Sequence, residues 1–183
     1  ADTATQLGFT DFNVGGNRAS ELPSGVRIGR PGASVAQDIE PEFVSISPDS
    51  RTAFITLQEN NAIAVVDLVS ARISRIFALG FKDHGLARNA FAPSDRATVL
   101  NPPDLITLPN VLGVYMPDTA ATFTVGGKTY IVTANEGDDR NDFLTNFGGL
   151  SSSLEETRRL SALTLDPVAF PNAASIQQAS VAG

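Results

Sequence analysis

The chain has 183 residues, of which 42% are hydrophobic, with a mean hydropathy of +0.02 and a formal charge of −7. Its thirteen Lys and Arg residues are scattered and form no basic stripe, which argues against nucleic-acid binding, and the absence of Cys excludes disulfides, thiolate catalysis and Cys-based zinc sites. No apolar run approaches the ~20 residues of a membrane span. The chain starts at Ala1 without Met or a recognisable targeting segment, which suggests a processed or trimmed chain.

The first 79 residues predict a stray strand, a loop and one four-stranded unit. Residues 7–14 alternate apolar and polar side chains and predict a strand that ends a preceding blade, and residues 18–32 are too rich in Pro and Gly for a long helix. Residues 33–79 then predict one blade of a β-propeller, since four short strands are expected there, at 43–46, 53–57, 62–68 and 73–79.

The remaining chain predicts an insertion and a second blade. Residues 80–110 have no clean period and contain four prolines, so they are interpreted as a long insertion that packs on the scaffold. Residues 111–170 are expected to form most of a second blade, with strands at 111–125 and 129–134 and a loop insertion at 138–153. Further expectations are one helical turn at 154–160, a short strand at 163–165 and a mobile tail after Pro171.

An internal repeat supports this division. Pro41-Glu42 is followed by Glu59, 17 residues after Glu42, and Pro117-Asp118 is followed by Glu136, 18 residues after Asp118. Both copies run Pro, acid, strand, turn, strand, amide, Glu, and the two glycines of the second turn suit the positive φ angles of a hairpin. We therefore predict an all-β fold, a β-propeller segment of about two four-stranded antiparallel blades plus a stray strand, with long loop insertions.

Several blocks of sequence resemble a known family. Residues 35–42, 57–67, 82–84, 115–118 and 133–138 are similar to signature blocks of the choice-of-anchor I family, whose members are exported or cell-surface bacterial propellers that resemble esterase-like phytases and atypical alkaline phosphatases. The resemblance spans about residues 21–166. It implies an extracellular, periplasmic or cell-surface location. It also implies that the chain is an internal fragment, with the remaining blades supplied by the same polypeptide or by a partner chain.

The candidate chemistry rests on oxygen ligands. A Ser/His/Asp triad would need His84, the only His, and no Gly-x-Ser-x-Gly motif is present. Carboxylate and amide oxygens suit Ca²⁺ or Mg²⁺. The candidate metal ligands are Asp38, Glu40, Glu42, Glu59, Asp118, Asn135, Glu136 and Asp138, with Asp139 beside them. The alternative is that such acids are solvated turn residues.

Topology predicts that these acids gather at one end of the sheets. In a meander, the start of the first strand and the connection between the second and third lie at the same end, which would pair Glu42 with Glu59 and Asp118 with Glu136. Gathered carboxylates require a cation, a basic side chain or protonation. Arg140, Arg158 and Lys82 are the candidate basic partners, or would hold a phosphate. A metal or phosphate site and a ring of structural salt bridges both remain open.

Two functional classes follow. The first is a metal-dependent phosphoesterase resembling alkaline phosphatase or phytase, in which a bound cation activates water, and Glu59, Glu136 and Arg140 are the catalytic candidates. The second is a noncatalytic propeller module that presents loops to a protein, a glycan or a larger assembly. The residues do not decide between them.

Overall fold

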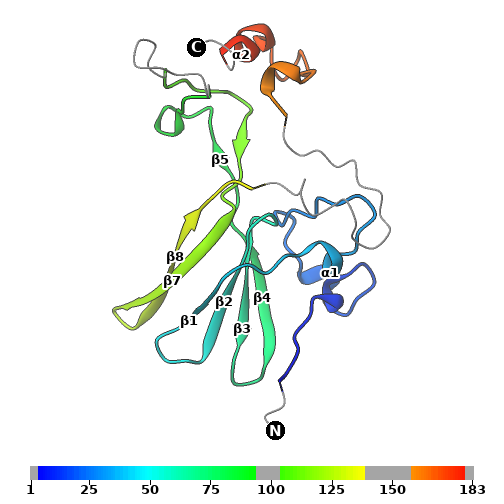
Figure 1. Ribbon diagram of the computed structural model, residues 1–183, viewed down its shortest axis with the longest axis vertical. Helices are drawn as coiled ribbons and strands as arrows, with labels where there is room; N and C mark the ends of the chain where they lie inside the picture. The colour runs from blue at the N-terminus through cyan, green and yellow to red at the C-terminus, as the bar shows by residue number, and fades with distance from the viewer. Residues whose placement is uncertain (1–3, 94–103, 139–157, 180–183) are drawn as a thin grey trace. The chain divides into compact units, whose positions relative to one another are not determined.

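The computed structural model describes residues 4–93, 104–138 and 158–179, and these are mostly β structure (Figure 1). They contain one four-stranded and two two-stranded antiparallel sheets with few helices, and none of these sheets is closed. The chain divides into two compact units. The first contains Ala1–Gly80 and Val114–Asp139, and the second contains Phe81–Gly113 and Arg140–Gly183.

The first unit is built on a four-stranded antiparallel meander. Its strands lie in the order β1 (Val44–Ile46), β2 (Thr52–Leu57), β3 (Ala62–Asp67) and β4 (Arg72–Ala78). The four strands that the sequence predicted are confirmed within a residue or two at their ends. Tight turns join them because polar side chains bind the turn backbone: Asp49, for example, accepts hydrogen bonds from the Ser47 hydroxyl and the Arg51 N–H.

One face of this sheet holds the core. Paired residues such as Leu57 and Ala62 place their side chains on the same face, which the N-terminal segment covers with Phe12, Val26, Val35 and Ile39. The opposite face is also buried at Thr56, Ile63 and Val65. The central strand β3 is therefore covered on both faces, which explains its unbroken apolar sequence.

The N-terminal segment differs from the prediction. The strand expected at residues 7–14 was wrong, since this segment contains the 3₁₀ helix η1 (Thr10–Phe12). The Phe12 N–H bonds to the Phe9 carbonyl in a local turn, so it does not pair with another strand. The rings of Phe9 and Phe12 lie 6.3 Å apart, and Phe12 is part of the core. As expected, no long helix follows, only the 3₁₀ helix η2 (Ala19–Glu21) and the one-turn helix α1 (Val35–Asp38).

A second hairpin completes the first unit. Strands β7 (Pro117–Val125) and β8 (Lys128–Asn135) are joined by Gly126 and Gly127, whose positive φ angles of 57° and 74° confirm the predicted turn. Pro117 lies opposite Asn135 and Thr119 opposite Ala134, so Asp118 is an extra residue in a bulge. This extra residue accounts for the spacing from Asp118 to Glu136, which is one residue longer than that from Glu42 to Glu59.

The hairpin packs on the first sheet through one of its faces. The Thr122 hydroxyl donates a 2.6 Å hydrogen bond to the Ile46 carbonyl, and the Thr56 hydroxyl donates to the Asp118 carbonyl at 3.0 Å. The other face is exposed and apolar, with the Phe123 and Tyr130 rings stacked 5.5 Å apart. The described part of the second repeat holds these two strands, and residues 139–157 of the expected second blade lie outside the described residues. The four-stranded second blade, the domain boundaries and the propeller arrangement stay predictions.

The second unit includes most of the expected insertion. Strands β5 (Lys82–Asp83) and β6 (Leu112–Gly113) pair, and the 3₁₀ helix η3 (Ala87–Asn89) follows β5. The strand expected at 163–165 was wrong, because Leu163 ends the 3₁₀ helix η4 (Leu160–Ala162) by bonding back to the Leu160 carbonyl. The tail after Pro171, which was expected to be mobile, contains helix α2 (Ala173–Ala179), and its mobility stays a prediction. Residues 154–157 of the helical turn expected at 154–160 lie outside the described residues.

Candidate functional site

The connection between β2 and β3 is the centre of the candidate site. It comprises Gln58, Glu59, Asn60 and Asn61, hereafter the polar turn, and each of these residues is at most 5% exposed. The Asn61 N–H bonds to the Gln58 carbonyl, and Asn61 takes the positive φ angle of 52° that Asn tolerates better than most residues. Polar side chains buried this completely need hydrogen-bond partners, and those partners show what the turn does.

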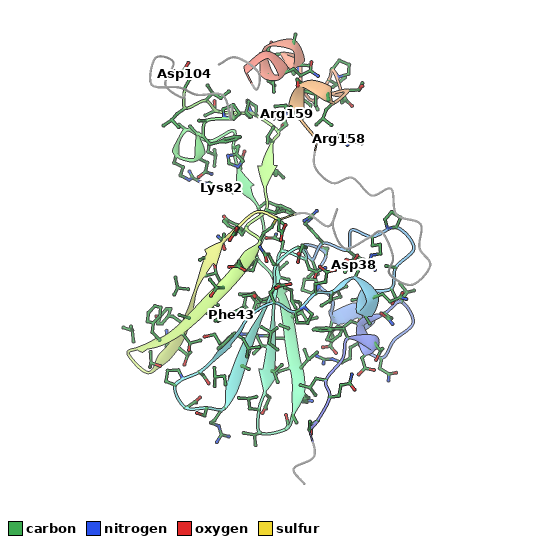
Figure 2. All side chains as sticks on the ribbon, in the orientation of Figure 1. Asp38, Phe43, Lys82, Asp104, Arg158 and Arg159 are labelled. Atoms are coloured by element: carbon green, nitrogen blue, oxygen red, sulfur yellow. The ribbon has the colours of Figure 1, made fainter. Side chains whose placement is uncertain are left out.

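Asn60 connects the polar turn to the N-terminal segment. The carboxylate of Asp38, which is fully buried, accepts hydrogen bonds from the backbone N–H groups of Gly29 (3.0 Å) and Arg30 (2.8 Å) and from the Asn60 amide (3.2 Å). The same amide also donates to the Arg27 carbonyl at 2.8 Å. Figure 2 shows Asp38 within this N-terminal segment. The Asp38 side chain is therefore bound by internal N–H donors.

Asn61 connects the turn to two further points of the first unit. Its amide nitrogen donates to the Gly80 carbonyl at 2.8 Å, and its Oδ1 accepts hydrogen bonds from the backbone N–H groups of Tyr115 at 2.8 Å and Met116 at 3.3 Å. The chain leaves the first unit after Gly80 and re-enters it at Val114. The Asn61 side chain thus binds the first unit both where the chain leaves it, at Gly80, and just after the chain re-enters it, at Tyr115 and Met116.

Gln58 and Glu59 complete the set of contacts. The Gln58 amide donates to the Glu136 carbonyl at 2.9 Å, where the chain leaves β8. The Arg27 guanidinium donates to the Glu59 carbonyl at 2.9 Å, while the Glu59 side chain stays buried. The polar turn therefore binds the N-terminal segment, both ends of segment 81–113 and the residue after β8.

The predicted gathering of acids agrees with the backbone. The Glu42 N–H bonds to the Thr56 carbonyl, close to the polar turn, and the Glu136 N–H bonds to the Met116 carbonyl, next to Pro117. Each acid pair therefore lies at one end of its own hairpin. The side chains have different environments: Glu42, Asn135, Glu136 and Asp138 are exposed, Glu40 and Asp118 are half-buried, and Asp38 and Glu59 are buried.

The residues that the structure describes contain no group of three or more His, Cys, Asp or Glu side chains arranged to hold a metal ion. Glu40 has a basic neighbour instead, with one carboxylate oxygen 3.7 Å from the Arg30 guanidinium. Lys82 and Arg158 are exposed in the second unit, and Asp139 and Arg140 lie outside the described residues. The ligand and catalytic assignments stay predictions.

Sequence reasoning missed the amides. Gln58, Asn60 and Asn61 supply the side-chain hydrogen bonds described above, and the available signal was their position between two strongly apolar strands. The only His also has structural contacts within the second unit. His84 Nδ1 is 2.9 Å from the Asn89 carbonyl, and its ring packs 4.4 Å from the ring of Phe91.

The choice-of-anchor I domain model matches residues 1–183. The chain belongs to the choice-of-anchor I family. Membership of this family indicates a secreted or cell-surface protein. No curated protein and no solved structure matches the chain. In the part of the chain that the structure describes, no helix has the length and apolar character needed to cross a membrane.

Proposed function

We propose that this choice-of-anchor I chain is a noncatalytic β module of an exported bacterial protein, at the cell surface, in the periplasm or outside the cell. It presents exposed surface to a protein or glycan within a larger assembly. The observation that carries the proposal is the engagement of the polar turn in internal hydrogen bonds. Asn60 and Asn61 are fully buried and bind backbone groups from distant parts of the first unit.

This arrangement favours a scaffold over a reaction centre. Catalysis or cation binding needs oxygen atoms that face a space open to substrate or ion. The Asp38 carboxylate instead faces two backbone N–H groups and an amide. Breaking such contacts to admit a ligand would leave buried donors unpaired, at about 1–3 kcal/mol each.

The exposed face of the second hairpin supports a role in contacting partners. Phe123, Val125, Tyr130 and Val132 are each about half exposed and belong to one two-stranded sheet. An apolar surface of this kind commonly marks an interaction site. We propose that it is covered by the remaining blades of a longer propeller polypeptide or by a partner chain.

The alternative function, a metal-dependent phosphoesterase, is tested by measuring activity and cation binding. Phosphate release from a generic monoester is measured with added Ca²⁺ or Mg²⁺ and with chelator, alongside calorimetric titration of both ions. The matched variants are Glu59→Gln in the polar turn and Glu136→Gln at the corresponding exposed position. We expect no chelator-sensitive release and no heat of cation binding for any of the three proteins. Chelator-sensitive release that is lost in Glu59→Gln would overturn the noncatalytic proposal and support the metal site predicted from the sequence.

A further inference from the structure

The outer edge of the four-stranded sheet is blocked by its own residues. Ser74 is an extra residue in β4, opposite the step from Val65 to Val66, so the edge strand is bulged. The Arg18 guanidinium donates to the carbonyls of Ile73 at 2.5 Å and Ser74 at 3.0 Å. Bulges and charged side chains are the usual means by which proteins prevent another strand from adding to a sheet.

The opposite edge, β1, is also occupied. The Ile46 carbonyl accepts the hydrogen bond of the Thr122 hydroxyl, so a polar group of the first edge strand is used by the second hairpin. Each edge of the first sheet therefore has backbone carbonyls engaged by a side chain of the first unit.

In the part of the chain that the structure describes, strand β8 has no such protection. Among the described residues it pairs with β7 alone, and its eight residues contain no Pro and a single charge, Lys128 at the start. Its centre, Thr129 to Thr133, consists of residues that favour β structure. A long edge of this composition is suited to pairing with another strand.

The turn geometry identifies the groups that are available. A two-residue turn with both φ angles positive is of type I′, and the residues that flank it, Val125 and Lys128, form a hydrogen-bonded pair. Hydrogen bonding alternates along an antiparallel strand, so Tyr130 and Val132 direct their N–H groups toward β7. The N–H groups of Thr129, Ile131 and Thr133 then point to the open edge.

We propose that β8 accepts a partner strand, supplied by a β-hairpin with the chemistry of β3 and β4. The internal repeat identifies this occupant. In the first copy the second strand of the hairpin, β2, pairs along all six of its residues with β3, which is apolar on both faces. In the second copy β8 takes the place of β2 and offers apolar side chains on both faces at Ile131 and Val132. This inference rests on the proposed module function and names the edge through which the module joins its assembly.

The test uses the full chain and a fluorescent synthetic peptide of residues 62–78, AIAVVDLVSARISRIFA, which supplies the β3–β4 chemistry. Thr133→Pro removes an outward N–H, whereas the matched variant Thr133→Val keeps it. We expect saturable binding to the wild type and to Thr133→Val. Binding to Thr133→Pro should be weaker by roughly five- to tenfold, the value of about one backbone hydrogen bond. Hydrogen exchange at Tyr130 and Val132 checks that the hairpin is retained in each variant.

Three results would overturn the inference. The first is that the peptide binds Thr133→Pro as tightly as the wild type while the hairpin is intact. The second is that a scrambled peptide binds the wild type as tightly as the designed one. The third is that the peptide does not bind and the wild type forms a dimer that Thr133→Pro abolishes. The last result would assign the edge to a second copy of the chain. Because the peptide assay does not involve phosphate release or cations, its failure is distinguishable from failure of the noncatalytic proposal.

Discussion

The two copies of the repeat use the same sequence pattern in opposite environments. The amide and Glu residues of the polar turn are buried, whereas Asn135 and Glu136, which follow β8 in the second copy, are exposed. The difference comes from what surrounds each turn: four backbone segments converge on the first. An amide and a Glu after a strand therefore do not define a ligand site by themselves. Their role depends on the segments that cover them.

The largest effect expected from this comparison is at Asn61. Asn61→Ala leaves the Gly80 carbonyl and the Tyr115 and Met116 N–H groups without their partner in a buried site. At about 1 kcal/mol for each group, the free energy of unfolding should fall by about 3 kcal/mol. Urea unfolding followed by circular dichroism measures the change, provided that the m value stays constant.

Asn135→Ala in the second copy is the matched control. Its side chain is exposed and accepts a hydrogen bond from the nearby Thr133 hydroxyl, so we expect a change of no more than about 0.5 kcal/mol. If the free energy of unfolding fell by a similar amount in both variants, burial would not explain the difference between the two copies of the repeat.

The same contrast explains what could be predicted from the sequence. Strands β1 to β4 and the second hairpin were predictable because their apolar periods and turn residues agree. The segment around Phe12 was not, because apolar residues at 7 and 9 and again at 12 and 14 have the spacing of a strand. The three-residue step from Phe9 to Phe12, which suits a 3₁₀ turn, was overlooked. The acids were placed at the correct ends of their hairpins from topology. The burial of Asp38 and of the polar turn could not be predicted from the sequence, because it depends on segments distant in sequence, such as those of Arg27 and Tyr115.

The two hairpin turns give a second, smaller test. The first turn places Ser50 at a φ of 59°, whereas the second places Gly127 at 74°. A side chain costs roughly 1 kcal/mol in this region, so Gly127→Ala should destabilise the second hairpin by about that amount. Ser50→Gly should relieve the same strain and be neutral or stabilising, by up to about 0.5 kcal/mol. Hydrogen exchange in β8 and β2 reports each hairpin separately, and a stabilising Gly127→Ala would refute this account.

The smallest expected effect is a difference between the two hairpins in how their stability depends on pH. In the first sheet, the pKa of Asp67, in the turn between β3 and β4, is lowered from its ordinary value of 3.8, chiefly by the Ser70 backbone N–H and then by that of Val69. The turn between β7 and β8 consists of two glycines and has no side chain that titrates. A lowered folded-state pKa means that this stabilisation is complete above pH 3.8 and is lost as the pH falls through the folded-state value. Asp67→Asn keeps an oxygen acceptor but removes the titration, so the wild type should exceed this variant in thermal stability at pH 6. The difference should shrink toward pH 2. A difference that stays constant across this range would show that the Asp67 charge does not stabilise the turn between β3 and β4.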